Sequence, residues 1–177
     1  MFKKIIKYFA DKYLLKFDQS RKREKKIKTL KDSKYIGILW NPEDEGSQDA
    51  YESLRKIVQS KKIKTTGIAQ IDSIREMEIL TTNTKSGFLD KHNVTWLGRP
   101  KSKAGIHFIE EPFDILIDLS VNKTIALQYM LVHSQAIFKV GWKGEDPNYY
   151  DLSIDIAEKP PCKYLMEQIV YYLEKIN

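Results

Sequence analysis

The stretch FDILIDLSVNKTIALQYMLVHSQAIFKVG, residues 113–141, determines the fold class. It starts with an apolar run over residues 113–119 and ends with a second apolar run over residues 136–141. Between the runs, apolar residues recur at helical spacing, which predicts a helix over residues 121–134 with Ser120 as its N-cap. A strand, a helix and a strand in succession form a βαβ unit, so this stretch predicts two parallel strands joined by one helix.

The same alternation continues on both sides. Upstream, YIGILW at residues 35–40 predicts a buried strand that ends at the Asn41-Pro42 turn, and residues 65–71 predict another strand. Apolar residues at helical spacing predict a helix over residues 47–61, with Ser47 as its N-cap. Downstream, residues 152–157 predict a strand, and Pro160-Pro161 opens a C-terminal helix.

The segment between residues 73 and 112 has weaker patterns. Residues 74–80 fit a short helix or a strand, residues 95–97 fit a short strand, and residues 85–93 and 100–105 are expected to be loops. Taken together, the patterns predict one α/β domain over residues 35–177. It is Rossmann-like, with a mostly parallel sheet and helices on both faces.

Residues 113–141 resemble the N-terminal Rossmann-like half of glycosyltransferases of the heptosyltransferase type. The shared pattern is an aromatic-Asp strand that leads through a helix to a strand ending in Val-Gly; its residues here are Phe113, Asp114, Ile117, Asp118, Leu119, Val140 and Gly141. The resemblance implies an architecture. Because 177 residues leave no room for the second domain that holds the donor in those enzymes, it implies at most a degenerate sugar or nucleotide binder.

The whole chain also resembles a family of small proteins from Bacteroidetes-type bacteria, which forms a domain of unknown function. The resemblance runs from the basic start through WLGRP (96–100), FDILIDLS (113–120) and FKVG (138–141) to YYLEKI (171–176). It implies a shared fold and no particular chemistry.

The positive charge is concentrated at the N-terminus. Residues 1–34 hold thirteen Lys and Arg against four Asp and Glu, a net charge of +9, whereas the rest of the chain carries −3. Such an asymmetry is typical of a protein that contacts a negatively charged partner with one end. We therefore treat residues 1–34 as a basic N-terminal arm and residues 35–177 as the body.

The first half of the arm predicts a strongly amphipathic helix over residues 2–17. Its stripe of large apolar residues would anchor the arm to a membrane or a partner; these residues are Phe2, Ile5, Ile6, Phe9 and Tyr13. After residue 18 basic residues dominate, and we expect the helix to continue through them to residue 34 because no Pro or Gly interrupts it. The cations predicted to contact nucleic acid are Arg21, Lys22, Arg23, Lys25, Lys26 and Lys28.

Three interpretations of the arm remain open. The stripe can pack on the body, with the basic run as a solvated face. The cations can bind phosphates of RNA or of a ribonucleoprotein such as the ribosome, which is the preferred hypothesis. The helix can also lie on an anionic membrane surface, which would make the protein peripheral to the inner membrane. An acidic protein partner would fit the same charge.

A second candidate site lies at the carboxyl ends of the predicted strands, where open parallel sheets bind ligands. Seven residues could form a ligand crevice there: Trp40, Asn41, Asp118, Ser120, Asn122, Lys123 and Trp142. An anion could bind at the helix N-terminus after Ser120, close to Lys123. The alternative is that these residues cap the helix, form a turn and fill the sheet.

Composition excludes several classes of protein. A single cysteine, Cys162, allows no intrachain disulfide, and the spacing of the three histidines matches no zinc pattern, so we expect no metal. The sequence contains neither a phosphate-binding loop nor a dinucleotide-binding glycine turn, so no cofactor is expected. No catalytic residues stand out, and no apolar run is long enough for a spanning helix. We expect a non-enzymatic, cytoplasmic protein.

Overall fold

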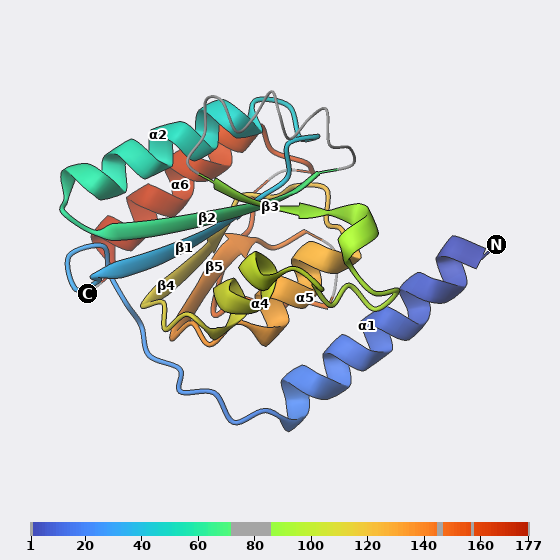
Figure 1. Cartoon of the computed structure of the whole chain (residues 1–177). Coiled ribbons are helices and arrows are strands. Elements are labelled where there is room, and N and C mark those ends of the chain that lie inside the picture. The colour runs from blue at the N-terminus through green and yellow to red at the C-terminus, as the bar shows by residue number, and fades with distance from the viewer. Residues whose placement is uncertain (1, 72–85, 145–146, 157, 177) are drawn as a thin grey trace.

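The computed structural model of the chain describes residues 2–71, 86–144, 147–156 and 158–176, except for the side chains of residues 2 and 3. Figure 1 shows a single sheet between two layers of helices. In chain order the elements are α1 Phe2–Ser20, β1 Tyr35–Trp40, α2 Ser47–Ser60, β2 Lys64–Ile71, β3 Ser86–Asp90, the 3-10 helix η1 Lys91–Asn93, α4 Lys103–Glu110, β4 Ile115–Asp118, α5 Ile125–His133, β5 Phe138–Trp142, β6 Leu152–Ile154 and α6 Cys162–Lys175.

All strand pairs of the six-stranded sheet are parallel, in the order β3-β2-β1-β4-β5-β6. The direction of the crossovers reverses between β1 and β4, which pair from Ile36 opposite Ile115 to Leu39 opposite Asp118. This is the strand order of the Rossmann fold. The predicted Rossmann-like fold class is therefore confirmed.

Two hydrophobic layers enclose the sheet. On one face α2 and α6 lie side by side, and their apolar residues meet those of β1, β4 and β5 in the larger core. On the other face α4 and α5 pack together, and α1 packs along α5. Gly37 allows a close approach on this second face, because a Cβ atom there would lie 2.7 Å from the ring of Phe113. The N-terminal arm therefore adds a helix to the outside of this layer.

The arm is not a continuous helix as predicted. Helix α1 ends at Ser20, whose hydroxyl donates to the carbonyl of Phe17, and residues 21–29 contain no regular secondary structure. The physical reason is tertiary. The guanidinium group of Arg21 bonds to a backbone carbonyl in the last turn of α5, and that of Arg23 bonds to two carbonyls in the segment after it. An extended chain is needed to reach them in succession.

The predicted helix over residues 121–134 starts four residues later, at Ile125, with Thr124 as its N-cap in place of Ser120. Two carboxylates hold the preceding residues in a turn. Asp118 accepts from the backbone N–H of Ser120, and Asp44 accepts from the N–H groups of the next two residues. These bonds fix residues 120–122 in non-helical conformations, and the helix starts only after the N-cap Thr124. Ser47 is likewise the first helical residue of α2 and not its N-cap, which is Gly46 with a positive φ of 70°.

Other differences lie in the weakly patterned segment. Residues 95–97 form a turn and no strand, and residues 86–93 form β3 and η1 where a loop was expected. Helix α4 covers residues 103–110, so its first three residues fall in the loop expected over residues 100–105. Helix α4 has the N-cap Ser102, whose hydroxyl accepts from the N–H of Gly105, and it buries only Gly105 and Phe108. So few buried residues leave almost no apolar periodicity to detect. The prediction for residues 74–80 falls outside the described part of the chain.

Candidate functional site

The basic arm divides into cations bonded within the protein and cations exposed to solvent. Arg23 is the most buried of the bonded cations: its side chain is 8 % exposed and makes a two-pronged ion pair with Asp151 at 2.6 and 2.7 Å. It also donates to two backbone carbonyls after α5. Arg21 donates to the carbonyl of Val132 and to Gln135, and Lys28 pairs with Asp114 at 3.1 Å.

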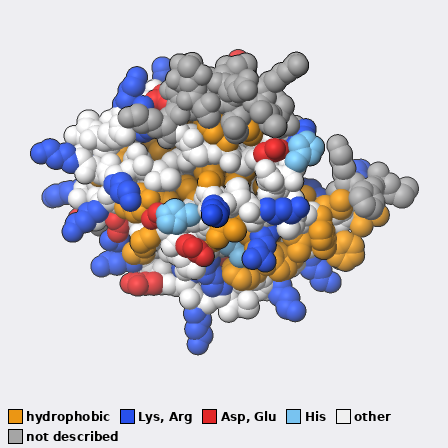
Figure 2. Space-filling view, in the orientation of Figure 1, with side chains coloured by type: hydrophobic (Ala, Val, Ile, Leu, Met, Phe, Trp, Pro, Cys, Tyr) orange, Lys and Arg blue, Asp and Glu red, His pale blue; other side chains and the backbone are white. Residues whose placement is uncertain are grey.

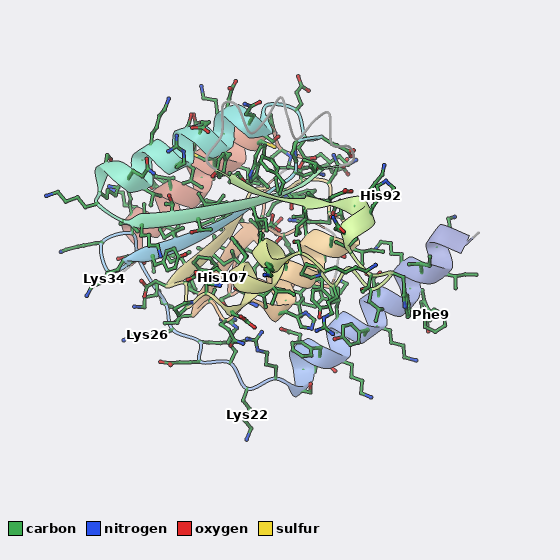
Figure 3. The ribbon with its side chains drawn as sticks, in the orientation of Figure 1. Phe9, Lys22, Lys26, Lys34, His92 and His107 are labelled. Atoms are coloured by element: carbon green, nitrogen blue, oxygen red, sulfur yellow. The ribbon has the colours of Figure 1, made fainter. Side chains whose placement is uncertain are left out.

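The other three predicted nucleic-acid contacts, Lys22, Lys25 and Lys26, are exposed. Figure 3 shows Lys22 and Lys26 pointing away from the body. The ammonium group of Lys25 lies 3.7 Å from Asp151 and remains 64 % exposed. Three of the six predicted cations therefore stabilise the attachment of the arm. Arg21 satisfies a free carbonyl in the last turn of α5, whereas Arg23 and Lys28 form ion pairs with Asp151 and Asp114.

Replacing Arg23 with alanine is expected to lower the free energy of unfolding by about 3–5 kcal/mol, because Asp151, whose side chain is 11 % exposed, would lose its two-pronged partner and keep only the solvated Lys25 at 3.7 Å. The matched control is Lys25→Ala, expected to change it by less than about 0.5 kcal/mol because that side chain is largely solvated. Urea denaturation of the full chain measures both. Equal, small effects would show that Arg23 does not hold the arm in place.

The inner face of α1 is held by stacked aromatic rings. The ring of His133 lies between those of Tyr129, with a centroid distance of 3.7 Å, and Phe17, at 3.9 Å. Its Nδ1 bonds to the backbone carbonyl of Tyr129, which can only accept, so Nδ1 carries the hydrogen and Nε2 accepts from the hydroxyl of Tyr13 at 3.2 Å. Leu14 and Ala10 complete this face and are fully buried.

This environment keeps His133 neutral. Burial, reinforced by the nearby charges of Arg21, Lys139 and Arg99, lowers the pKa of His133 from 6.5 to about 4. Lys139 is itself buried under the end of α5 and donates to the carbonyls of Leu131 and Val132. Burial and the two arm arginines lower the pKa of Lys139 to about 7. A proton added to His133 would therefore face cations and little water.

Docking of α1 is expected to weaken as the pH falls from about 6.5 to about 4 and to level off below that range. The sign follows from the lowered pKa: in this window the undocked or unfolded state takes up a proton on His133 that the docked state cannot. Hydrogen exchange of α1 amides, corrected for the intrinsic rate, measures the effect. The variant His133→Phe keeps the stack without the titrating group and should remove the pH dependence; an unchanged profile in this variant would contradict the assignment.

The outer face of α1 is apolar and basic at once. Its large hydrophobic residues remain exposed: 48 % for Ile5, 61 % for Tyr8, 52 % for Phe9 and 40 % for Leu15. Lys4, Lys12 and Lys16 are exposed between them. Hydrophobic side chains gather over α1 among Lys and Arg side chains at the lower right of Figure 2, and Phe9 points away from the body in Figure 3.

The predicted apolar stripe is therefore divided between two faces. Tyr13 contacts the body, and Ile6 is half-buried, whereas Ile5 and Phe9 point outwards. The side chain of Phe2 lies outside the described part of the chain. Tyr8 and Leu15 complete the outer face and were not singled out by the stripe; helical spacing from Ile5 and Phe9 is the signal that could have found them.

At the carboxyl edge of the sheet, Asp118 is the centre of a buried hydrogen-bond network. Its carboxylate is 1 % exposed and accepts from the N–H and hydroxyl of Ser120, from the ammonium group of Lys123 at 3.0 Å and from the hydroxyl of Tyr150 at 2.6 Å. Burial and the charge of Asp118 raise the pKa of Tyr150 well above 10, so this hydroxyl keeps its proton. Within this network, Asp118, Ser120, Lys123 and Tyr150 are hydrogen-bonded to one another.

The anion position predicted after Ser120 is filled by a side chain of the protein. The carboxylate of Asp44 accepts from the N–H groups of Val121 and Asn122 and from the side-chain amide of Asn122. Asn41 donates to the carbonyl of Asn122, which ties the loops after β1 and β4 together. Neither Asp44 nor Tyr150 was among the predicted residues; both lie far from Asp118 in sequence.

The two tryptophans differ in role. Trp40 is fully buried, stacks on Tyr51 with centroids 4.9 Å apart, and donates to the hydroxyl of Ser86. Trp142 lines a cavity of about 230 Å³ together with Lys7, Asn122 and Lys123. Six of the seven predicted crevice residues thus lie together at the carboxyl edge of β1, β4 and β5, namely Asn41, Asp118, Ser120, Asn122, Lys123 and Trp142. The seventh, Trp40, is buried in the core.

A second cavity of about 480 Å³ lies next to this edge, lined by Asp44, Lys159 and the start of α6. Cys162 is part of its lining and is almost completely buried. Burial, with the charges of Asp44 and Asp118, raises the pKa of this thiol to about 11, so it is protonated at neutral pH and is a poor nucleophile. A helix N-terminus alone would lower the pKa; here burial dominates.

Within the described ranges, no group of three or more His, Cys, Asp or Glu side chains is placed to hold a metal ion. Within the same ranges, every helix is too short or too polar to cross a bilayer.

Comparison with known protein families gives a match that spans nearly the whole chain. Residues 3–176 match DUF6913, which is described as a family of unknown function. The chain belongs to this family. The resemblance to a domain of unknown function is thereby confirmed, whereas the resemblance to heptosyltransferase-type enzymes stays a prediction. No curated protein matches the chain. Membership of DUF6913 assigns no chemistry, so the function has to be argued from the geometry.

Proposed function

We propose that the protein binds an anionic membrane surface through the outer face of α1, formed by Lys4, Ile5, Tyr8, Phe9, Lys12, Leu15 and Lys16. The observation that carries the proposal is the exposure of four large hydrophobic side chains on a helix whose opposite face is already packed against α5. Contiguous apolar surface of this kind marks an interaction site. Its basic neighbours select a negatively charged partner.

Both the hydrophobic side chains and the lysines of this face favour binding to lipid. Fully burying a large apolar side chain contributes about 1.5–3 kcal/mol, and a lysine near an anionic bilayer contributes about 1 kcal/mol. Lysines between apolar residues can bury their methylene stems and keep the ammonium group at the head groups. Because α1 is already folded against the body, binding does not have to order it, which removes a large part of the usual cost of association.

RNA is the second candidate, supported by the exposure of Lys22, Lys25 and Lys26 along the extended segment after α1. This segment would contact phosphates through counterion release. Large aliphatic residues contribute little to phosphate binding. The outer face of α1, with Ile5 and Leu15 exposed, therefore favours lipid over RNA.

Co-sedimentation of the full chain with vesicles tests the proposal. We expect binding to vesicles of phosphatidylcholine mixed with phosphatidylglycerol, weaker binding to phosphatidylcholine alone, and only partial loss at high salt because the apolar contribution persists. Single-stranded RNA is the competing ligand. Tight RNA binding that salt removes, with no vesicle binding, would overturn the lipid proposal in favour of RNA.

A further inference from the structure

The turn at residues 95–98 presents a large aromatic side chain on a rigid support. Trp96 is 59 % exposed. The backbone around it is held by bonds from Thr95 N–H to the Arg99 carbonyl, from Gly98 N–H to the Thr95 carbonyl and from Arg99 N–H to the Thr95 hydroxyl. An antiparallel bridge between Val94 and Pro100 closes the base. The indole is therefore presented from a closed, hairpin-like loop.

This turn lies against the N-terminal end of α5. Gly98, with a φ of 85°, packs so closely on α5 that a Cβ atom would lie 2.5 Å from the carbonyl oxygen of Ile125, the first residue of that helix. Only glycine combines this φ with this approach. The position of the turn relative to α5 is thus determined by backbone contact.

The exposed part of α1 reaches the same end of α5. Lys7 lines a cavity with Asn122 and Gln128, which lie before and within the first turn of α5, while Tyr13 stacks on Tyr129 further along. Residues 5–9 therefore lie beside the N-terminal end of α5, as the turn does. Figure 1 agrees, since the chain between η1 and α4 runs towards α1.

We infer that Trp96 is a second lipid contact, which inserts at the membrane interface beside the outer face of α1. This inference rests on the proposed function. Trp is enriched where a bilayer meets water, because its ring is apolar and its N–H is polar. The charges around the turn are complementary to anionic lipid: Arg99, Lys101 and Lys103 are all exposed. Two contacts on different elements would define the orientation of the protein on the bilayer. With α1 as its single contact, the protein could still rotate about the axis of that helix.

The experiment uses the intrinsic fluorescence of the full chain, which contains three tryptophans. Trp40 is fully buried and Trp142 is 9 % exposed, so Trp96 is the accessible one. We expect anionic vesicles to shift the emission of Trp96 to shorter wavelength. Phosphatidylcholine brominated on its acyl chains, mixed into the same vesicles, should quench it. The variant Trp96→Phe assigns the signal to this residue.

Affinity gives a second readout. Trp96→Ala should weaken vesicle binding about tenfold, whereas Tyr164→Ala, an exposed aromatic residue on α6, should leave it unchanged. Vesicle binding without quenching of Trp96, or an unchanged affinity in Trp96→Ala, would overturn this inference and leave the role of α1 intact. Absence of vesicle binding by the wild-type chain would overturn the proposed function, and the role of Trp96 with it.

Discussion

The double variant Ile5→Glu/Phe9→Glu is expected to lose vesicle binding by about a hundredfold or more, while its melting temperature stays that of the wild-type chain. Since each side chain is about half exposed before binding, each substitution removes an apolar contribution of about 1 kcal/mol to insertion, and it also adds a negative charge against an anionic surface. Both side chains are about half exposed and lie on the face of α1 opposite α5, so folding should tolerate the change. Co-sedimentation and thermal denaturation measure the two effects separately.

The matched control places the same charge on another exposed aromatic residue. Tyr164→Glu on α6 should bind vesicles as the wild-type chain does. Retained binding by the double variant would show that the outer face of α1 does not contact lipid. A wild-type chain that is dimeric in solution and becomes monomeric on these two substitutions would also contradict the proposal, because the face would then be an interface between two copies.

The isosteric variant Asp118→Asn is expected to lower the free energy of unfolding by about 3–5 kcal/mol, a large share of the total stability of a domain of this size. The carboxylate is buried and neutralises Lys123 while accepting from Tyr150 and Ser120. An amide has no charge for the ammonium group and offers N–H donors where four donor groups already converge. Urea denaturation followed by circular dichroism measures the loss.

The control for this variant is Asp155→Asn. Asp155 forms an ion pair with Lys143, and its side chain is 73 % exposed. Its effect should be below about 0.5 kcal/mol, as is usual for solvated pairs. If Asp118→Asn proved as mild, the network would not be structural. Asp118 would then again be a candidate for binding a ligand in the crevice.

The strands of the core could be predicted from sequence because their apolar runs are local. Residues 35–40 and 113–119 read as buried strands, and the structure has β1 and β4 there, paired at the centre of the sheet. Helix α6 starts directly after Pro160-Pro161 as expected. Helix α4 could not be predicted, since only Gly105 and Phe108 of its eight residues are buried.

The candidate sites were predicted in part. The residues of the crevice do gather at the carboxyl edge, because the parallel strands end there, but their partners Asp44 and Tyr150 come from other loops and fill the site. For the arm, the sequence predicted the net positive charge and the amphipathic character of its helix. Its division into an inner and an outer face depends on the contacts that Tyr13 and Phe17 make with His133.

The sequence by itself determined the Rossmann-like sheet, the amphipathic helix at the N-terminus and the separation of charge, because apolar periodicity and composition are properties of neighbouring residues. Only the tertiary structure decided which of the basic side chains are buried against the body and which stay exposed. Arg21, Arg23 and Lys28 find carbonyls and carboxylates roughly a hundred residues away, whereas Lys22, Lys25 and Lys26 remain in solvent. A cation looks the same in sequence whether it pairs or not, since its partner is set by distance in the folded chain.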